Sequence, residues 1–190
     1  MVLDFDASVN IMFTPAFEGS KTTHTPGDLG GTTRNGLTQR NYSAFRQKHE
    51  LPDQSIELAD LDEIKSWYRI YCWDDAGCDK IFISGKDKLA FTIFNCAVNR
   101  SFAKAVSMLQ EVLELPTITG YFGPITLETV NNCDEQATIT KYLESMTKYY
   151  VDHVTQNPSQ KQFIHDWLGR VNSVAKVVDS DYHTDPHQLD

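Results

Sequence analysis

The chain has 190 residues, enough for one large domain or two small domains with a real hydrophobic core. Hydrophobic residues make up 41% and charged residues 23%, values that exclude a collagen-like fibre, extensive disorder and a disulfide-dense scaffold. Asp and Glu outnumber Lys and Arg by 26 to 17, and the resulting net charge of −9 argues against nucleic acid as a partner. No window approaches the roughly 18 consecutive apolar residues of a membrane span, so we expect no membrane insertion.

The N-terminal segment and the cysteines bear on the cellular compartment. Residues 1–6 (MVLDFD) lack the basic flank and apolar stretch of a secretory signal, so we expect synthesis in a cytoplasm and release by another agent. Cys72, Cys78, Cys96 and Cys133 form no CxxC pair and have no histidine at a zinc-ligand spacing. Free thiols are favoured and no metal is expected, although an oxidising compartment would permit a Cys72–Cys78 bridge.

Residues 18–37 (EGSKTTHTPGDLGGTTRNGL) have a composition of their own. They hold five of the ten glycines and show no apolar periodicity, which predicts turns and a small β-hairpin. Long irregular segments inside a compact domain are usually functional, so this region is the first place to look for a site.

Helical periodicity dominates from residue 38 onward. Polar residues that precede apolar stretches predict helix caps at Thr38, Asp60, Ser101 and Asp134. Asp60 and Glu63 have the spacing of a capping box. Residues 88–98 are apolar on nearly all sides, which predicts a buried central helix. Pro124 fits the first position of a short helix, and Pro158 separates the last two helices.

These elements predict a mainly α fold with a small Gly/Thr-rich β-hairpin lobe near the N-terminus. We expect a single domain over residues 1–178, with a catalytic region at 1–99 and a second helical region at 100–178. Residues 179–190 are acidic and lack an apolar stripe, which predicts a flexible tail.

Two carboxylates in the Gly/Thr region are candidates for acid–base chemistry. Glu18 follows an apolar run that includes Phe17, and a desolvated carboxyl group favours its protonated form, as a general acid requires. Asp28 lies in a polar, Gly-rich turn, where it should stay ionised. Two carboxyl groups in contrasting environments are typical of glycosidases. The alternative is that Glu18 is an ordinary surface residue and Asp28 an ordinary turn residue.

The order of motifs resembles a known family. Residues 17–19 (FEG), 28–33 (DLGGTT) and 36–38 (GLT) are similar to the E-G-G-Y and D-P-G-G-x-T-x-x-G-I-T motifs of glycoside hydrolase family 108, the phage endolysin-type N-acetylmuramidases. Further similarities to the family and to its adjoining peptidoglycan-binding-type region occur, in the right order, within residues 67–74, 89–99, 109–127 and 163–171. The likeness covers roughly residues 5–175.

The resemblance implies a lysozyme-like fold and hydrolysis of the β-1,4 bond between N-acetylmuramic acid and N-acetylglucosamine in peptidoglycan, without a cofactor. Glu18 would protonate the leaving oxygen, while Asp28 and Thr33 would stabilise charge and hold the attacking water. Thr32 is an alternative to Thr33, because the gaps of nine residues after Glu18 and four after Asp28 differ by one from the usual phage-type spacing.

Five further residues are candidates for substrate binding: Gly31, Thr32, Tyr71, Trp73 and Asn99. The aromatic rings could stack on sugar faces, although their helical spacing favours packing in the core. The Asn99 side chain could hydrogen-bond an N-acetyl group or cap a turn.

The resemblance also bears on partners and on alternatives. An enzyme made in the host bacterial cytoplasm needs a partner to reach the periplasmic cell wall, either a holin or a virion with its tail proteins. The acidic net charge argues against unaided attack on the cell from outside. Ser20 and Lys21 depart from the family motif, which keeps open a non-catalytic virion structural or wall-binding protein. Lytic transglycosylation, in which no water attacks, is a third possibility.

Overall fold

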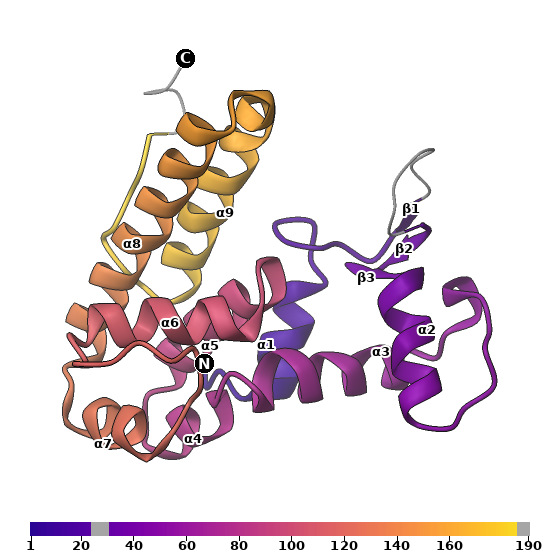
Figure 1. Cartoon of the computed structure of the whole chain (residues 1–190), viewed down its shortest axis with the longest axis horizontal. Helices are drawn as coiled ribbons and strands as arrows, with labels where there is room; N and C mark the ends of the chain where they lie inside the picture. Colours follow the sequence, from indigo (N-terminus) through magenta and orange to yellow (C-terminus); the bar gives the residue numbers. More distant parts are fainter. Residues whose placement is uncertain (24–30, 186–190) are drawn as a thin grey trace.

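The computed structural model of the chain describes residues 1–23 and 31–185. In these ranges the elements are, in order, α1 (Phe5–Met12), β1 (Thr22–Thr23), β2 (Thr33–Arg34), β3 (Leu37–Thr38), α2 (Gln39–Lys48), α3 (Leu61–Tyr68), α4 (Cys78–Ile83), α5 (Asp87–Asn99), α6 (Phe102–Val112), α7 (Pro124–Asn132), α8 (Glu135–Gln156) and α9 (Ile164–Val177). The described chain also contains two 3-10 helices, η1 (Ile56–Leu58) and η3 (Pro158–Phe163), and one π-helix, η2 (Arg69–Asp74). The expected mainly α fold with a small β lobe is confirmed (Figure 1).

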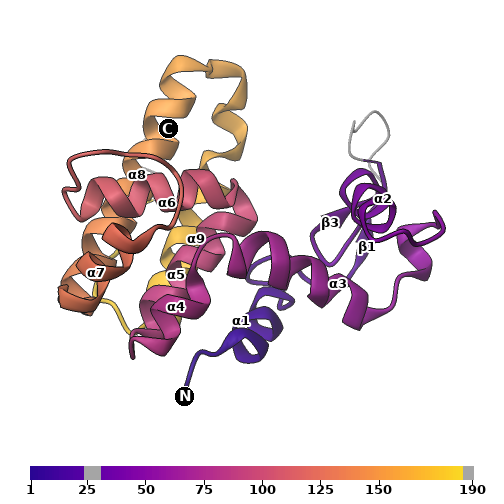
Figure 2. The ribbon, with the colours of Figure 1, turned by 60° about the horizontal axis from the view of Figure 1, so that its bottom comes forward.

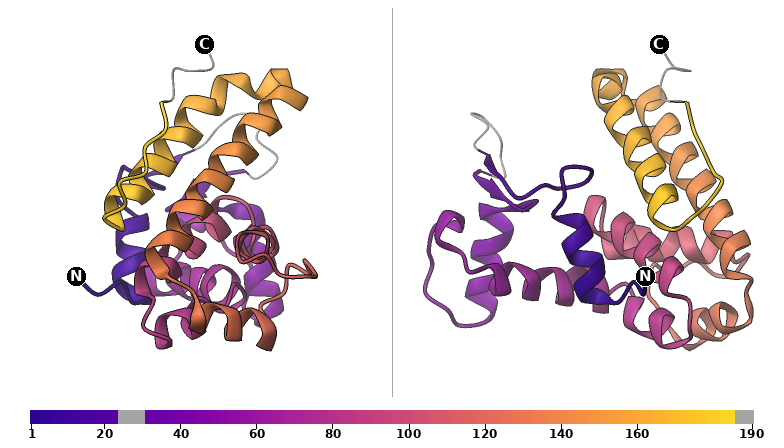
Figure 3. Two further views of the ribbon diagram at one scale, coloured as in Figure 1. Left: turned by 90° about the vertical axis from the view of Figure 1, so that its left-hand side faces the viewer. Right: turned by 180° about the vertical axis from the view of Figure 1, so that it is seen from behind.

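The molecule has a small lobe and a larger helical lobe. The small lobe contains the sheet, α2 and the beginning of α3, and α3 runs from it into the helical lobe (Figure 1). The helical lobe is built around α5, whose residues 89–97 are all buried against α4, α6 and α8. Figure 2 shows α4 and α7 side by side at the end of this lobe, while α8 and α9 form an antiparallel pair that extends away from it (Figure 3).

Most predicted caps form as expected. The side chains of Thr38, Ser101 and Asp134 accept backbone N–H groups three residues ahead, at the beginnings of α2, α6 and α8. Asp60 caps α3 through the N–H of Asp62. The capping box expected at Asp60 and Glu63 does not form, because the Glu63 carboxylate turns toward α2 and pairs with an arginine there.

The sheet has three antiparallel strands in the order β1-β2-β3. Asn35 and Gly36 connect β2 to β3 with φ values of 49° and 78°, the left-handed conformation that an Asn-Gly hairpin turn requires. Thr33 pairs with Thr38 and with Thr23, so β2 is the central strand. The predicted hairpin lobe is confirmed and extends one residue beyond residue 37.

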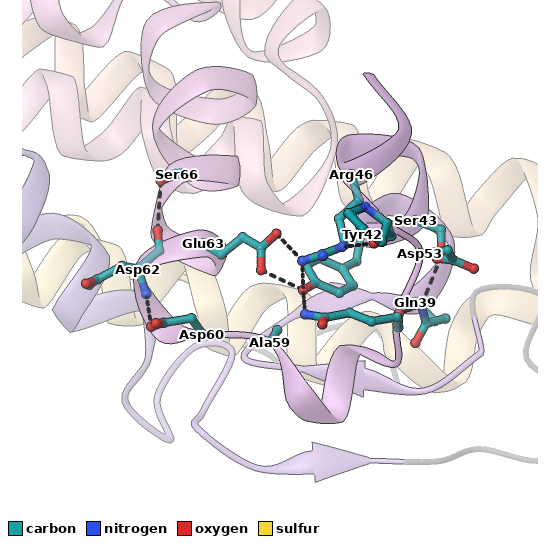
Figure 4. A network of polar contacts seen from close by, with 12 residues as sticks. Gln39, Tyr42, Ser43, Arg46, Asp53, Ala59, Asp60, Asp62, Glu63 and Ser66 are labelled. Atoms are coloured by element: carbon teal, nitrogen blue, oxygen red, sulfur yellow. Dashed lines mark hydrogen bonds and ion pairs between the residues drawn. The ribbon is translucent and has the colours of Figure 1, made fainter. Parts of the chain in front are cut away.

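A network of polar side chains braces the small lobe (Figure 4). Arg46 on α2 donates to a Glu63 carboxylate oxygen at 2.6 Å, and the Tyr42 hydroxyl donates to the other oxygen at 2.7 Å. Gln54 donates to the Tyr42 hydroxyl. Burial, followed by the hydrogen bond to Glu63, raises the pKa of Tyr42 above its ordinary value. The network joins α2 to the segment after it and to α3. It therefore holds in place the helix α2 against which strand β3 packs.

The C-terminal segment differs from the expected flexible tail over its described part. Residues 179–185 return along α8 and α9 (Figure 3). The Tyr182 hydroxyl donates to Thr147 at 2.8 Å, and the Asn172 side chain exchanges hydrogen bonds of 2.8 and 2.9 Å with the backbone of Thr184. A single half-buried aromatic residue and backbone hydrogen bonds thus anchor residues 179–185 without an apolar stripe, and residues 186–190 lie outside the described part.

Candidate active site

Glu18 lies in a turn after α1, at the boundary between the two lobes. Its backbone N–H donates to the carbonyl of Met12 at 2.9 Å, and the N–H of Gly19 donates to Thr14 at 3.0 Å. Phe17 packs edge-on against Phe91 of the central helix α5. The turn is therefore anchored to the core, which fixes the direction in which the Glu18 side chain points.

The Glu18 carboxylate forms an ion pair with Arg170 of α9. The Nη2 atom of Arg170 lies 2.8 Å from Oε1, as an ion pair rather than an aligned hydrogen bond. The two side chains are 19% and 10% exposed, so water screens the pair only partly. Arg170 also donates through Nε to Asn95 at 3.1 Å, and the fully buried Asn95 side chain contacts the Met12 sulfur.

The other side of the Glu18 carboxylate faces the hairpin turn. A Cβ atom added at Gly36 would lie 2.6 Å from Glu18 Oε2 and 2.5 Å from the Tyr68 hydroxyl oxygen. That hydroxyl donates to the carbonyl of Asn35 at 2.7 Å. Burial raises the pKa of Tyr68 well above its ordinary value, and the negative charge of Glu18 adds to the effect. Tyr68 is therefore neutral, and Gly36 is the residue that allows the turn to approach the carboxylate.

Glu18 lines a pocket of about 480 Å³ between the loop after α1 and the sheet. The described lining consists of Pro15, Phe17, Glu18, Gly19, Ser20, Lys21, Thr23, Thr33 and Gly36. The structure thus brings together two residues predicted as catalytic, Glu18 and Thr33. The third, Asp28, lies outside the described residues.

Gly31 and Thr32 precede Thr33 in the chain, but neither is among the described residues that line the pocket. Gly31 has a φ of 73°, and the carbonyl of Thr32 accepts the N–H of Gln39 at 2.7 Å, which joins the end of the loop to the beginning of α2. Of the two threonines considered for holding water, Thr33 is the one that lines the pocket.

The remaining substrate-binding candidates lie in packed environments. Trp73 is 1% exposed and packs edge-on against Phe5 and Phe94, so its ring belongs to the core and no sugar can reach it; that expectation is corrected. Tyr71 is half-buried beside Trp67. Asn99 accepts a hydrogen bond from the Tyr150 hydroxyl at 2.9 Å.

The cysteines are free thiols, and Cys72, Cys78 and Cys96 are buried. Burial raises the pKa of each of these three thiols, so they stay protonated near neutral pH. Over residues 1–23 and 31–185 no cluster of His, Cys, Asp and Glu is arranged to hold a metal ion. No helix in this part of the chain is long and apolar enough to cross a membrane.

Comparison with known proteins agrees with this geometry. Residues 11–100 match the family model of glycosyl hydrolase 108, and residues 104–172 match that of a predicted peptidoglycan domain. Residues 11–100 thus form a region of the glycosyl hydrolase 108 family. This family assignment supports a glycoside hydrolase, and the second match supports peptidoglycan as its substrate and the cell wall as its place of action.

A solved structure of Brucella abortus SagA has the same fold as this chain. The TM-score is 0.74 at 22% sequence identity, and the match covers 92% of each chain. No curated protein sequence matches the chain. The lysozyme-like fold expected from the resemblance is thus confirmed along nearly the whole length.

Sequence reasoning did not find three residues that surround Glu18: Arg170, Asn95 and Tyr68 as a hydroxyl donor to the turn. Arg170 belongs to the sequence pattern of the last helix, but a pattern does not show which distant side chain a residue meets. More than 150 positions separate it from Glu18, so the pair is revealed only by the folded structure, in which α9 packs on α8 and α8 on the central helix.

Proposed function

We propose that this protein is an N-acetylmuramidase that hydrolyses the β-1,4 bond between N-acetylmuramic acid and N-acetylglucosamine, with Glu18 as the general acid. The observation that carries the proposal is the position of Glu18. Among the described residues that line the pocket it is the one carboxylate, and it shares the pocket with Thr33 of the central strand. The family match supplies the reaction class, and the pocket supplies a place where a sugar can meet an acid.

The reaction follows the ordinary course of glycosidic cleavage. Protonated Glu18 gives its proton to the glycosidic oxygen while the C–O bond breaks, which leaves positive charge on the sugar ring. A water molecule attacks the ring carbon and loses its proton to a base, a role we assign to the Asp28 carboxylate. The Thr33 hydroxyl lines the pocket and would hold this water.

The net charge of −9 bears on how the enzyme reaches its substrate. Like charges repel, so approach to an anionic envelope from outside is unfavourable. We assign the protein to a phage, as an endolysin released through a holin or as a virion-associated lysozyme delivered with tail proteins. In both cases it acts on peptidoglycan in the periplasm or cell wall after synthesis in the host cytoplasm.

The products of peptidoglycan digestion test the reaction type. Purified sacculi are incubated with the protein, and the soluble fragments are reduced and analysed by mass spectrometry. Hydrolysis by a muramidase leaves reducing N-acetylmuramic acid ends and adds one water for each bond cut. Anhydro-sugar ends would instead establish a lytic transglycosylase. No soluble fragments between about pH 4 and 8, the range in which carboxylate acid catalysts work, would favour a non-catalytic wall-binding protein.

A further inference from the structure

The ion pair at the site joins two regions that the family matches separate. Glu18 belongs to the glycosyl hydrolase 108 match, residues 11–100, whereas Arg170 belongs to the peptidoglycan-domain match, residues 104–172. In the structure the two charged groups are 2.8 Å apart and both are largely shielded from water. A detachable binding module would not be expected to place a side chain against the catalytic acid of its neighbour.

Arg170 is itself held from two further sides. Its Nε donates to Asn95 of α5 at 3.1 Å, and its guanidinium lies over the ring of Phe17, 5.5 Å from the centroid. Asn95 is fully buried in the central helix. The guanidinium is therefore fixed to the core and to the residue that precedes Glu18, which makes it a rigid partner rather than a mobile surface charge.

We propose that Arg170 is a positioning residue for Glu18, and that the region matched as a peptidoglycan domain completes the active site. The proposal rests on the role proposed for Glu18. When the acid gives up its proton it becomes negative, and a fixed guanidinium at this distance stabilises the charge that develops in the transition state. Arg170 also holds the carboxyl group in one orientation toward the pocket.

The groups around Glu18 show which of them can carry a charge beside it. The groups that face Glu18 are Arg170 from α9, Lys21 from the loop in the shared pocket, Tyr68 from α3 and Cys72 from the π-helical turn. Burial raises the pKa of both Tyr68 and Cys72, so neither carries charge near neutral pH. Arg170 is thus the cation that the structure places in an ion pair with Glu18, and Lys21 is a second cation in the same pocket.

The test compares Arg170→Gln and Arg170→Lys with the unaltered protein across the pH range of peptidoglycan cleavage. Arg40→Gln on the exposed side of α2 removes the same charge elsewhere and is the control. For Arg170→Gln we expect the maximal rate to fall at least about tenfold, because the acid is misplaced. We also expect the loss to lie in kcat while KM changes little, because the lost contact orients the acid and does not bind the substrate. Arg170→Lys should restore part of kcat, and Arg40→Gln should change neither kcat nor KM.

An Arg170→Gln protein with the kcat of the unaltered protein would overturn the proposal. A lower kcat that Arg170→Lys does not restore in part would also overturn it, because the charge would then not be what positions Glu18. If this variant does not fold, Asn95→Ser releases Arg170 from its second partner, and we expect a loss of at least about threefold in rate; an unchanged rate would overturn the proposal. Glu18→Gln is assayed in parallel, so that activity surviving its loss identifies failure of the proposed function instead.

Discussion

At the scale of single residues, the site depends on how closely a backbone can approach a carboxylate. Gly36 allows this approach, since its Cα faces both Glu18 and the hydroxyl of Tyr68. The asparagine before it holds that hydroxyl through its carbonyl. Two physical reasons therefore favour glycine at position 36. Its φ is positive, and the Glu18 side chain occupies the space that a Cβ atom would need.

Gly36→Ala tests this reading. A Cβ at this position would collide with Glu18 Oε2 and the Tyr68 oxygen, so the turn must move and the acid with it. We expect peptidoglycan cleavage to fall at least about tenfold and the unfolding free energy to fall by more than about 1 kcal/mol. Gly85→Ala is the matched control, since Gly85 has a similar φ of 82° but open space around it and lies outside the pocket lining. It should show the cost in stability alone, and equal losses of activity in both variants would refute the role of the contact.

The thiols provide a second prediction at this scale. Cys72, Cys78 and Cys96 are buried and their pKa values are raised by burial, whereas Cys133 is partly exposed. A thiol reagent near pH 8.5, about the pKa of a free cysteine, should modify one thiol per folded chain quickly and all four after denaturation. Two missing thiols in the denatured, unreduced protein would instead reveal a disulfide.

At the scale of elements, the segment after α9 contributes more than its composition suggests. Its contacts with Thr147 and Asn172 tie it across α8 and α9. Lys88 at the beginning of α5 also pairs with Asp179 at 2.9 Å, although this pair is exposed and contributes little.

Truncation after Asp179 should therefore destabilise the fold. Each lost hydrogen bond is worth about 0.5–1.5 kcal/mol, so we expect a loss of about 1–3 kcal/mol in unfolding free energy. Denaturant unfolding measures it, and a chain that ends at residue 185 is the control, since it keeps every described contact. A change below about 0.5 kcal/mol, the usual range for surface changes, would restore the interpretation as a dispensable tail.

At the scale of the whole molecule, local chemistry was readable from the sequence and long-range packing was not. Thr38, Ser101 and Asp134 identified helix beginnings because a cap depends on the next three residues. The short helix α4 and the π-helical turn before it were missed, since neither is long enough to show periodicity.

The site divides in the same way. Glu18 and Thr33 were predicted from a short segment with a family pattern, and the structure brings them to one pocket. Trp73 stayed a binding candidate beside its favoured core role, because a pattern of aromatic residues does not distinguish a cleft wall from a core. Its burial between Phe5 and Phe94 is decided by α1 and α5. Arg170 could not be found, because its approach to Glu18 depends on how the C-terminal helices pack on α5.

The role of Glu18 as the proton donor is the central claim, and the most direct measurement is the initial rate of release of soluble fragments from purified peptidoglycan by Glu18→Gln. Glutamine keeps the size of the side chain but has no acidic proton to give. General acid catalysis contributes about 10²–10⁴-fold, so the rate should fall by at least that order while the thermal unfolding profile shows a folded protein. Glu111→Gln, on the exposed side of α6, should cleave at the unaltered rate. A folded Glu18→Gln protein that releases fragments at nearly the unaltered rate would contradict the account.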